Sequence, residues 1–406
     1  MSFLEKLLEG VEVEWKPLGE VAKVLNGYAF KSSKYVNQGI RVIRISDVQK
    51  GKMSNKDLKF YPLESEKEIK QYLLFENDLV MSLTGYVGRV AMITKKDLPA
   101  GLNQRVACIR PYNKILTRYL FHYLDRIEFE TEAIANAVGG GQKNMSTVWL
   151  SKYSIPIPPI EIQQKIVAIL DTFTELTAEL TAELTARKSQ YTYYREKLLT
   201  FDENQVQHLP MGDERVGEFQ RGKRFVKTDL MTEGVPTIHY GEMYTHYGTW
   251  ADTTKSFLTE LLVKDKNLRK AQKGDVVIVA AGETIEDIGK GTAWLGEEGV
   301  VIHDACFSYK TTLNPKFVAY FTRTKQFHDQ IKKHISSGKI SAINSKGLEK
   351  AIIPVPPIEE QERIVSILDK FDTLTTSITE GLPKEIELRK KQYEYYRDML
   401  LSFPKN

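Results

Sequence analysis

Two stretches of this chain are nearly repeated further along it. Residues 157–173 read IPPIEIQQKIVAILDTF and residues 355–371 read VPPIEEQERIVSILDKF, identical at 11 of 17 positions. Residues 187–201 and 389–403 form a second repeated segment, identical at 10 of 15 positions. Repetition on this scale predicts two copies of one structural unit with a pseudo-symmetric role.

The repeat also runs through the more divergent stretches that precede these segments. Asp78-Leu79-Val80 matches Asp275-Val276-Val277, and residues 27–30 match residues 222–225. The predicted order is therefore domain, helix, domain, helix. Because the helical segments are nearly copied while the domains have diverged, we interpret the helices as common machinery and the domains as interchangeable recognition modules.

Length and cysteine usage exclude several classes of protein. With 406 residues the chain can hold two domains of about 150 residues, each with its own core. Cys108 and Cys306, which the repeat aligns with each other, are too few for a disulfide framework or a zinc site and are expected to be buried thiols. The sequence begins without a signal-peptide hydrophobic region, and no run approaches the ~18 apolar residues of a membrane span. We expect a soluble, cytoplasmic protein without membrane contact.

Short β-branched segments bounded by Gly, Asp, Asn or Pro predict strands in both domains. In the first domain they are residues 40–45, 78–83, 89–94 and 105–110, and in the second 275–282, 292–295, 300–303 and 305–310. One late helix is predicted in each, over residues 117–134 and 315–335. Each domain is therefore predicted to be α+β, with a curled sheet.

The net charge of +4 does not by itself indicate nucleic acid, but basic residues gather at the start of each domain. A glycine-marked polar loop also recurs late in each domain, GGGQKNMS at 139–146 and SSGKISAINS at 336–345. Such features suit a surface that follows DNA phosphates and contacts base edges, although solvated charge and a plain helix-to-strand connection explain them equally well. The candidate DNA contacts are Lys31, Arg41, Arg44, Arg105, Gln142, Lys143 and Asn144 in the first domain, and Lys223, Arg224, His239, Tyr240, Tyr244, Lys339 and Asn344 in the second.

A long helix is predicted to follow each domain. Pro158-Pro159 and Pro356-Pro357 prevent helix before them, and apolar residues then recur every three or four positions. A helix over residues 161–200 would be roughly 60 Å long, too long to pack only within one domain. We expect two such helices to form an antiparallel pair, the second with a break at Gly381 and Pro383. The candidate spacer and docking residues are Ile166, Phe173, Leu176, Leu180, Leu184, Tyr194, Ile364, Phe371 and Tyr396.

These motifs resemble one known family over essentially the whole chain. The doubled PPIExQ and QYxYYRxxLLxF segments and the TELTAELTAEL run at 174–184 resemble the specificity subunit of type I restriction-modification systems, closest to the type IC group. The resemblance implies two target recognition domains, each contacting one half of a bipartite asymmetric site in double-stranded DNA. It implies helices that set the spacing and dock two modification (methyltransferase) subunits, with restriction subunits completing the complex. The predicted division is 1–158, 159–203, 204–356 and 357–406, as recognition domain, spacer helix, recognition domain and helical region.

The catalytic chemistry of that family is not encoded in this chain. The string closest to an amino-methyltransferase motif, Asn314-Pro315-Lys316-Phe317, lacks the second proline and lies where a helix is predicted to begin. There is no G-x-x-x-x-G-K-S/T loop, and Gly139-Gly140-Gly141 follows no Rossmann signature. We therefore predict no catalytic residues, no metal and no cofactor on this chain, with S-adenosylmethionine, ATP and Mg on partner subunits. The alternatives are a helical protein-protein adaptor and a methyltransferase with a fused recognition domain.

Overall fold

The computed structural model describes residues 7–338, 340–377 and 379–404, so Lys339 lies outside the described residues. The chain divides into two compact units. One contains the residues up to Leu180 together with the segment from Glu385, and the other runs from Thr181 to Lys384. Each unit therefore contains one α+β domain, part of the helix that follows it, and part of the helix that follows the other domain.

The first domain is built from two four-stranded open sheets packed on each other. One sheet has the order β2-β11-β8-β9 and the other β6-β3-β10-β7, in which β3 and β10 are parallel. The strands are β1 (Glu14–Pro17), β2 (Ala22–Asn26), β3 (Ile40–Ile43), β4 (Val48–Gln49), β5 (Lys52–Met53), β6 (Phe60–Tyr61), β7 (Leu73–Leu74), β8 (Leu79–Ser82), β9 (Val90–Met92), β10 (Ala100–Leu102), β11 (Val106–Pro111) and β12 (Ser154–Ile157). The helices are α2 (Leu18–Val21), α3 (Glu66–Ile69), α4 (Thr117–Leu124), α5 (Ile127–Ala135) and α6 (Thr147–Lys152).

The second domain repeats this scheme. Its sheets have the orders β14-β23-β19-β21-β16 and β17-β15-β22-β18, with β15 and β22 parallel. The strands are β13 (Gln207–Pro210), β14 (Gly217–Arg221), β15 (Val235–Ile238), β16 (Trp250–Ala251), β17 (Ser256–Leu258), β18 (Lys270–Ala271), β19 (Val276–Val279), β20 (Ala281–Gly282), β21 (Gly291–Trp294), β22 (Val300–Ile302), β23 (Cys306–Thr311), β24 (Ser341–Ala342) and β25 (Ile352–Val355). The helices are α8 (Glu242–Thr245), α9 (Glu260–Asp265), α10 (Pro315–Phe321), α11 (Lys325–Lys332) and α12 (Ser345–Glu349).

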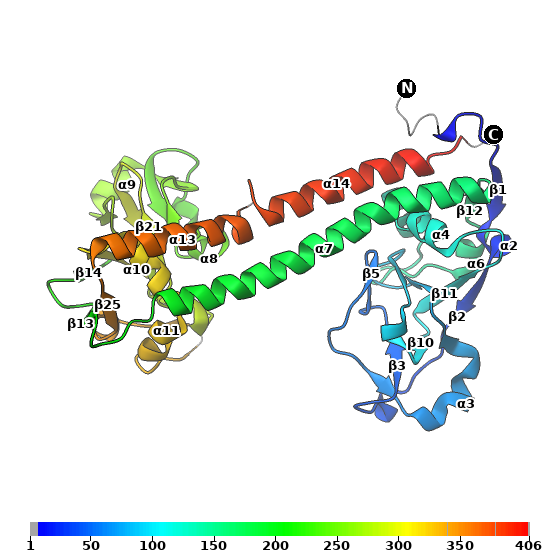
Figure 1. Cartoon of the computed structure of the whole chain (residues 1–406), viewed down its shortest axis with the longest axis horizontal. Helices are drawn as coiled ribbons and strands as arrows, with labels where there is room; N and C mark the ends of the chain where they lie inside the picture. Colours follow the sequence, from blue (N-terminus) through cyan, green and yellow to red (C-terminus); the bar gives the residue numbers. More distant parts are fainter. Residues whose placement is uncertain (1–6, 339, 378, 405–406) are drawn as a thin grey trace. The chain divides into compact units, whose positions relative to one another are not determined.

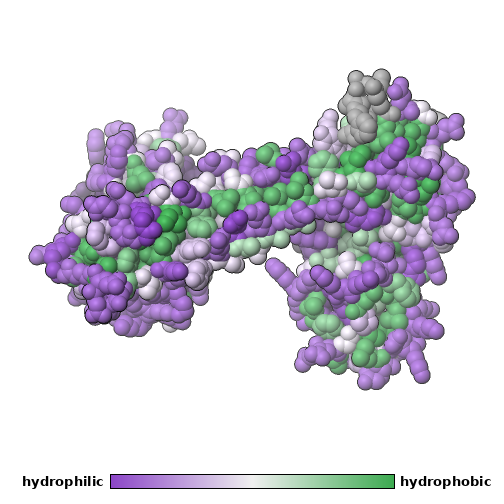
Figure 2. Space-filling view, in the orientation of Figure 1, coloured by the Kyte–Doolittle hydropathy of each residue, from purple (hydrophilic) through white to green (hydrophobic). Residues whose placement is uncertain are grey.

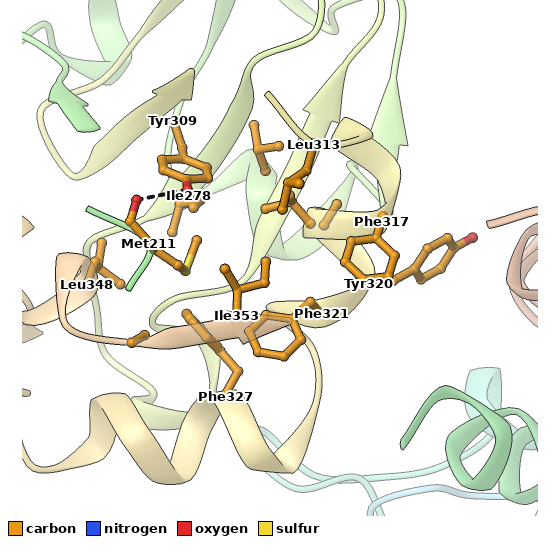
Figure 3. Packing of buried hydrophobic residues seen from close by; sticks show 14 of the residues in the cluster. Met211, Ile278, Tyr309, Leu313, Phe317, Tyr320, Phe321, Phe327, Leu348 and Ile353 are labelled. Atoms are coloured by element: carbon orange, nitrogen blue, oxygen red, sulfur yellow. Dashed lines mark hydrogen bonds between the residues drawn. The ribbon is translucent and has the colours of Figure 1, made fainter. Parts of the chain in front are cut away.

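Each domain has one core between its sheets and another between a sheet and the helices. Alternate residues of β8 and β11 face opposite ways, so Val80 and Cys108 belong to the first core while Met81 and Ala107 belong to the second. Figure 3 shows the helix-side core of the second domain, where the Tyr309 hydroxyl donates to the Met211 carbonyl at 2.9 Å. The α+β class and the internal duplication predicted from the sequence are confirmed.

The two helices predicted over 117–134 and 315–335 are each broken into two. In the first domain α4 ends at Leu124 and α5 begins at Ile127. In the second, the Thr324 side chain accepts from the Phe327 N–H and caps a new helix, α11. A threonine can lie inside one continuous helix or cap the start of a second helix. The apolar periodicity is the same in both cases, so it did not reveal the break.

The alignment of the two cysteines was wrong by two positions. Cys108 lies opposite Val80, the second residue of β8, whereas Cys306 lies opposite Val279, the last residue of β19. The position equivalent to Cys108 is Ser308. A shift of two residues keeps every side chain on the same face of a strand, so the hydrophobic pattern cannot detect it. Both thiols are buried, as predicted.

The match between residues 27–30 and 222–225 is confirmed by two closely packed glycines. A Cβ on Gly27 would lie 2.1 Å from the Asn103 carbonyl oxygen, and a Cβ on Gly222 would lie 2.2 Å from that of His303. Only glycine allows the chain leaving β2 or β14 to approach the end of β10 or β22 this closely.

The shared helical motif fixes each helix to the domain that precedes it. Helix α7 (Ile160–Leu198) is continuous over 39 residues, whereas the second copy is divided into α13 (Ile358–Thr376) and α14 (Leu382–Leu401). The predicted break is confirmed: Gly381 has φ +84° and Pro383 is the second residue of α14. Buried Gln163 accepts from the Leu116 N–H at 2.9 Å, and its copy Gln361 accepts from the Asn314 N–H at 2.8 Å.

The aspartate of the shared LD dipeptide is used in the same way in both copies. Asp171 lies 2.8 Å from His122 Nε2 and 3.0 Å from Arg118 Nε. Asp369 accepts from the Tyr320 hydroxyl at 2.6 Å and pairs with the Lys316 ammonium at 2.8 Å. The acid has therefore been kept while its partners in the domain have changed.

Within each unit the two helical segments run antiparallel, as Figure 1 shows for α14 beside the first part of α7. Phe173 stacks on Tyr396 at 5.2 Å between ring centroids in the first unit. Phe371 stacks on Tyr194 at 5.5 Å in the second. Among the described residues, no helix combines the length and apolar character that crossing a membrane requires.

Candidate nucleic-acid interface

Five connections of the first domain meet at one end of its sheets. The Tyr28 N–H donates to the Leu102 carbonyl at 2.7 Å, and the Asn103 N–H donates to the Ile43 carbonyl at 3.1 Å. The Leu83 N–H donates to the Arg105 carbonyl at 3.0 Å. The Met145 N–H donates to the Leu83 carbonyl at 2.8 Å. We call residues 26–31, 44–47, 83–88, 103–105 and 138–145 the first loop cluster.

The second domain holds its connections together with the same hydrogen bonds. The Lys223 N–H donates to the Ile302 carbonyl at 3.3 Å, and the His303 N–H donates to the Ile238 carbonyl at 3.4 Å. The Ala280 N–H donates to the Ala305 carbonyl at 2.7 Å. The Ile343 N–H donates to the Ala280 carbonyl at 2.8 Å. We call residues 221–227, 239–244, 280–287, 303–305, 336–338 and 340–343 the second loop cluster.

The first loop cluster brings together most of the residues predicted for that domain. Arg105 and Gln142 are exposed, and the Arg105 guanidinium makes no hydrogen bond or ion pair with the residues that the structure describes. Lys143 Nζ donates to the Ile134 carbonyl at 3.3 Å, and Asn144 Oδ1 accepts from the Thr84 hydroxyl at 2.8 Å. Of these four side chains, Arg105 and Gln142 are therefore the least constrained.

Lys31 and Arg44 also lie in the first loop cluster but differ in freedom. Lys31 is exposed at the start of a short 3-10 turn. The Arg44 side chain donates to Asp47 at 3.2 Å and to the Asp57 carbonyl at 2.5 Å. Burial disfavours the charged guanidinium, but the hydrogen bonds and charge of Asp47 outweigh it, and the pKa of Arg44 lies above its usual value. Arg44 is held in place, with its charge retained.

Arg41 does not offer a free guanidinium, contrary to our expectation. Arg41 is 5% exposed, and its side chain pairs with Asp97 at 2.5 Å and donates to the Ser54 carbonyl at 2.6 Å. A buried arginine paired in this way stabilises the chain around it and presents no group to DNA. Arg41 lies within β3 between the buried residues Ile40 and Val42, and the packing around this strand buries it.

The second loop cluster contains five of the seven residues predicted for the second domain. Lys223, Arg224, His239, Tyr240 and Tyr244 lie in it, with Arg224 exposed and the Tyr244 hydroxyl donating to the Ala281 carbonyl at 3.1 Å. Burial raises the pKa of Tyr244, so this phenol stays a donor. Lys339 lies outside the described residues.

Asn344 serves the fold. Its side-chain oxygen accepts from the Gly347 N–H at 2.9 Å and caps α12. Asn344 was predicted to contact DNA. The helix cap uses its side-chain oxygen, so its side-chain nitrogen is the group left for such a contact.

Sequence reasoning missed several exposed or aromatic members of the clusters. Tyr86 is 57% exposed beside Gly85, with the Arg89 guanidinium 3.8 Å from its ring centroid. His303 packs 4.9 Å from His239 between ring centroids. Burial and the neighbouring ring lower the pKa of His239, and burial lowers the pKa of His303, which favours neutral imidazoles. The glycine next to Tyr86, which recurs as Gly282, was the signal that could have identified this turn.

The predicted docking residues divide into buried and half-buried sets. Ile166 and Ile364 are fully buried in the helix-side cores and present no surface to a partner. The half-buried residues are Phe173, Leu176, Leu180, Leu184, Tyr194, Phe371 and Tyr396.

The surface of the helices is duplicated in detail. Tyr193 and Tyr395, at equivalent positions of the shared segment, are 59% and 65% exposed. Each packs edge-on against the next tyrosine, at 5.4 and 5.3 Å between ring centroids. Six residues earlier in each helix, Arg187 and Arg389 each donate to the glutamine three residues on at 2.9 Å. Hydrophobic residues gather along these long helices in Figure 2.

Comparison with known proteins identifies relatives over the full length of the chain. Residues 10–187 and 214–388 match the family model described as type I restriction modification DNA specificity domain. A putative type I restriction enzyme specificity subunit of Haemophilus influenzae is 34% identical, covering 99% of this chain and 98% of that protein. The EcoR124I/EcoR124II specificity subunit of Escherichia coli is also 34% identical, covering 100% of this chain and 98% of that protein.

Solved structures share the fold at lower identity. The type I S subunit of M. genitalium matches with a TM-score of 0.55 at 15% identity, covering 100% of both chains. A chain from a study of type I R-M complex assembly matches with a TM-score of 0.60 at 16% identity, covering 96% of this chain and 97% of that one.

Proposed function

This chain belongs to the family of type I restriction-modification DNA specificity subunits, and we propose that each of its domains recognises one half of a bipartite, asymmetric DNA site through its loop cluster. One observation carries the proposal. The four backbone hydrogen bonds that hold the loops together recur in both domains, while the side chains they present differ. Two domains that recognise two different DNA sequences require a shared backbone arrangement of the loops and different exposed side chains on it.

The polar groups of the clusters suit base edges and phosphates. Arg105 and Arg224 offer guanidinium groups, which match guanine in the major groove, and Gln142 offers an amide, which matches adenine. Exposed lysines such as Lys31 and Lys227 suit phosphates.

The duplicated helix surface supports docking of two copies of one partner. Equivalent exposed tyrosines and equivalent Arg–Gln hydrogen bonds present the same chemistry twice. Two modification subunits, each carrying S-adenosylmethionine, fit this duplication, and restriction subunits using ATP and Mg would complete the complex. On this proposal catalysis belongs to those partners, and the purified chain alone shows no methylation, cleavage or ATP hydrolysis.

Replacing Arg105 by Ala is expected to weaken recognition of the first half-site only. A bidentate guanine contact contributes about 1–3 kcal/mol of discrimination, which is roughly 5- to 150-fold in affinity. Titration of the complex against sites mutated in either half measures this. Lys95→Ala is the control, because Lys95 lies beyond the end of β9 that faces away from the first loop cluster. Equal losses in the two variants would contradict the assignment.

Single substitutions of the exposed tyrosines are expected to remove one modification subunit each. Tyr193→Ala and Tyr395→Ala should each leave a complex with one subunit, and the double variant should bind none, because interfacial tyrosines contribute strongly to binding. Native mass spectrometry counts the bound subunits. Tyr112→Ala, which removes a 49% exposed tyrosine of the first domain, should leave two. Two subunits bound to the double variant would exclude this surface.

A gel-shift assay separates the proposal from its alternatives. The chain is titrated with DNA carrying two-part sites, with and without a modification subunit. Specific binding that needs both half-sites and a partner for methylation supports the proposal. A protein-only adaptor would bind the partner without specific DNA, and methylation by the chain alone would indicate a fused methyltransferase.

A further inference from the structure

The second loop cluster encloses a cavity of about 450 Å³. This volume falls in the range of roughly 300–1,000 Å³ typical of small-molecule sites. Its lining comes from the connections that follow β14, β15 and β22, from residues 281–283 at β20, and from Ile340. The basic and aromatic side chains of the lining include Arg221, Arg224, Lys227, His239, Tyr240 and His303.

Aromatic rings form part of the wall of this cavity. The His303 ring lies 4.9 Å from that of His239 and 5.1 Å from that of Tyr240, between centroids. His303 is 8% exposed and held at both nitrogens, since Nε2 lies 2.9 Å from the Phe225 carbonyl and Nδ1 accepts from the Ala305 N–H at 3.1 Å. The His303 ring of this wall is therefore fixed before any ligand arrives.

Three basic side chains line another part of the cavity and outnumber its two acidic residues, Glu283 and Asp304. Arg224 and Lys227 are exposed and make no hydrogen bond or ion pair through their side chains with the part of the chain that the structure describes. Arg221 uses Nε to bind the Asp304 carbonyl at 2.9 Å, which leaves its terminal nitrogens available. A flat group with an attached anion would suit both the aromatic rings and the basic groups of this lining.

The shape of the cavity decides which part of DNA can enter it. The edges of paired bases lie at the floor of a groove, so they meet side chains that project outward and do not enter a concave site. Phosphates and unstacked bases do project from the duplex. A phosphate alone would satisfy the basic groups but leave the rings without a partner, whereas bases stack on aromatic side chains in sites that receive flipped nucleotides.

We propose that this cavity receives one unstacked nucleotide of the second half-site, with its base against His239, Tyr240 and His303 and its phosphate against Arg221, Arg224 and Lys227. This rests on the proposed function, because it requires that the second domain contacts DNA. In the first domain the positions of His239, Tyr240 and His303 are taken by Arg44, Ile45 and Asn103, so the prediction applies to the second half-site alone.

Mismatched DNA tests this directly, because a mismatch removes part of the cost of unstacking a base. The full chain with its modification subunits is titrated with cognate duplexes carrying one mismatch at a time. In each duplex only the strand opposite the tested base is altered. At one position of the second half-site the mismatch is expected to tighten binding by about tenfold or more. Tyr240→Ala should abolish this gain, and Tyr240→Phe, which keeps the ring, should retain it.

The control is His208→Ala, which removes an imidazole on β13 that does not line the cavity, and it should leave the gain unchanged. If every mismatch in the second half-site weakens binding or leaves it unchanged, while the matched site is bound specifically, the cavity receives no base. A gain that persists in Tyr240→Ala would place the unstacked base elsewhere and also overturn the inference. Absence of any sequence-specific binding by the unsubstituted complex would instead contradict the proposed function itself.

Discussion

Inserting one Thr-Ala-Glu-Leu unit after Leu184 is expected to lengthen the preferred gap between the two half-sites by one base pair. Helix α7 is continuous from Ile160 to Leu198, and Leu176, Leu180 and Leu184 are half-buried at a period of four residues. An inserted unit preserves this leucine seam, so the helix is expected to remain intact.

The size of the shift depends on helix geometry. Four residues lengthen an α-helix by about 6 Å and rotate the chain beyond the insertion by about 40°. One base pair of B-DNA advances about 3.4 Å and turns by about 35°. Translation alone would suggest nearly two base pairs, whereas rotation suggests one. A domain out of rotational phase would face phosphates in place of the groove. The rotation therefore determines the size of the shift, and we expect one base pair.

Methylation is measured on sites whose nonspecific gap varies one base pair at a time, with both half-site sequences held constant. The control is the unmodified chain assayed on the same set of sites. An unchanged preferred gap would show that α7 does not set the spacing.

Replacing Gly222 by Ala is expected to destabilise the second domain and abolish recognition of the second half-site. The added Cβ would lie 2.2 Å from the His303 carbonyl oxygen and 2.5 Å from that of Ile302, both of them backbone atoms. The strand end must therefore move, at a cost of about 1–3 kcal/mol or more. Gly27→Ala should act in the same way on the first half-site alone.

Thermal unfolding and half-site binding of each variant measure these effects. Gly248→Ala is a matched control in the second domain, because an added Cβ there has no atom within 4 Å. Its stability should stay within about 0.5 kcal/mol of the unsubstituted protein. Normal stability and normal recognition of both half-sites in Gly222→Ala would contradict the role assigned to this close approach.

The duplication, the α+β class and the long helices were predictable because they depend on local patterns and on self-comparison. The convergence of the loops was not, because Leu83, Arg105 and Met145 are brought together by backbone hydrogen bonds between distant segments. Sequence likewise could not separate Arg105, which is exposed, from Arg41, which pairs with Asp97. Arg41 lies in β3 and Arg105 directly precedes β11, so both adjoin apolar strand residues, and only tertiary packing distinguishes them.

The roles of the repeated helix residues could not be predicted from the sequence either. Gln163 and Asp171 were recognised as repeated but not assigned, because their partners lie 47 and 49 residues away. Repetition marked them as important, and the contacts explain why: each fixes the helix to the domain before it.

Exchange of one whole domain tests the central claim most directly. Residues 11–155 are replaced by the matching domain of a relative with a different site, and methylation by the complex is measured on a library of bipartite sequences. Modular recognition predicts a new first half-site, with the second half-site and the length of the gap unchanged. A change in both half-sites, or in neither, would contradict it.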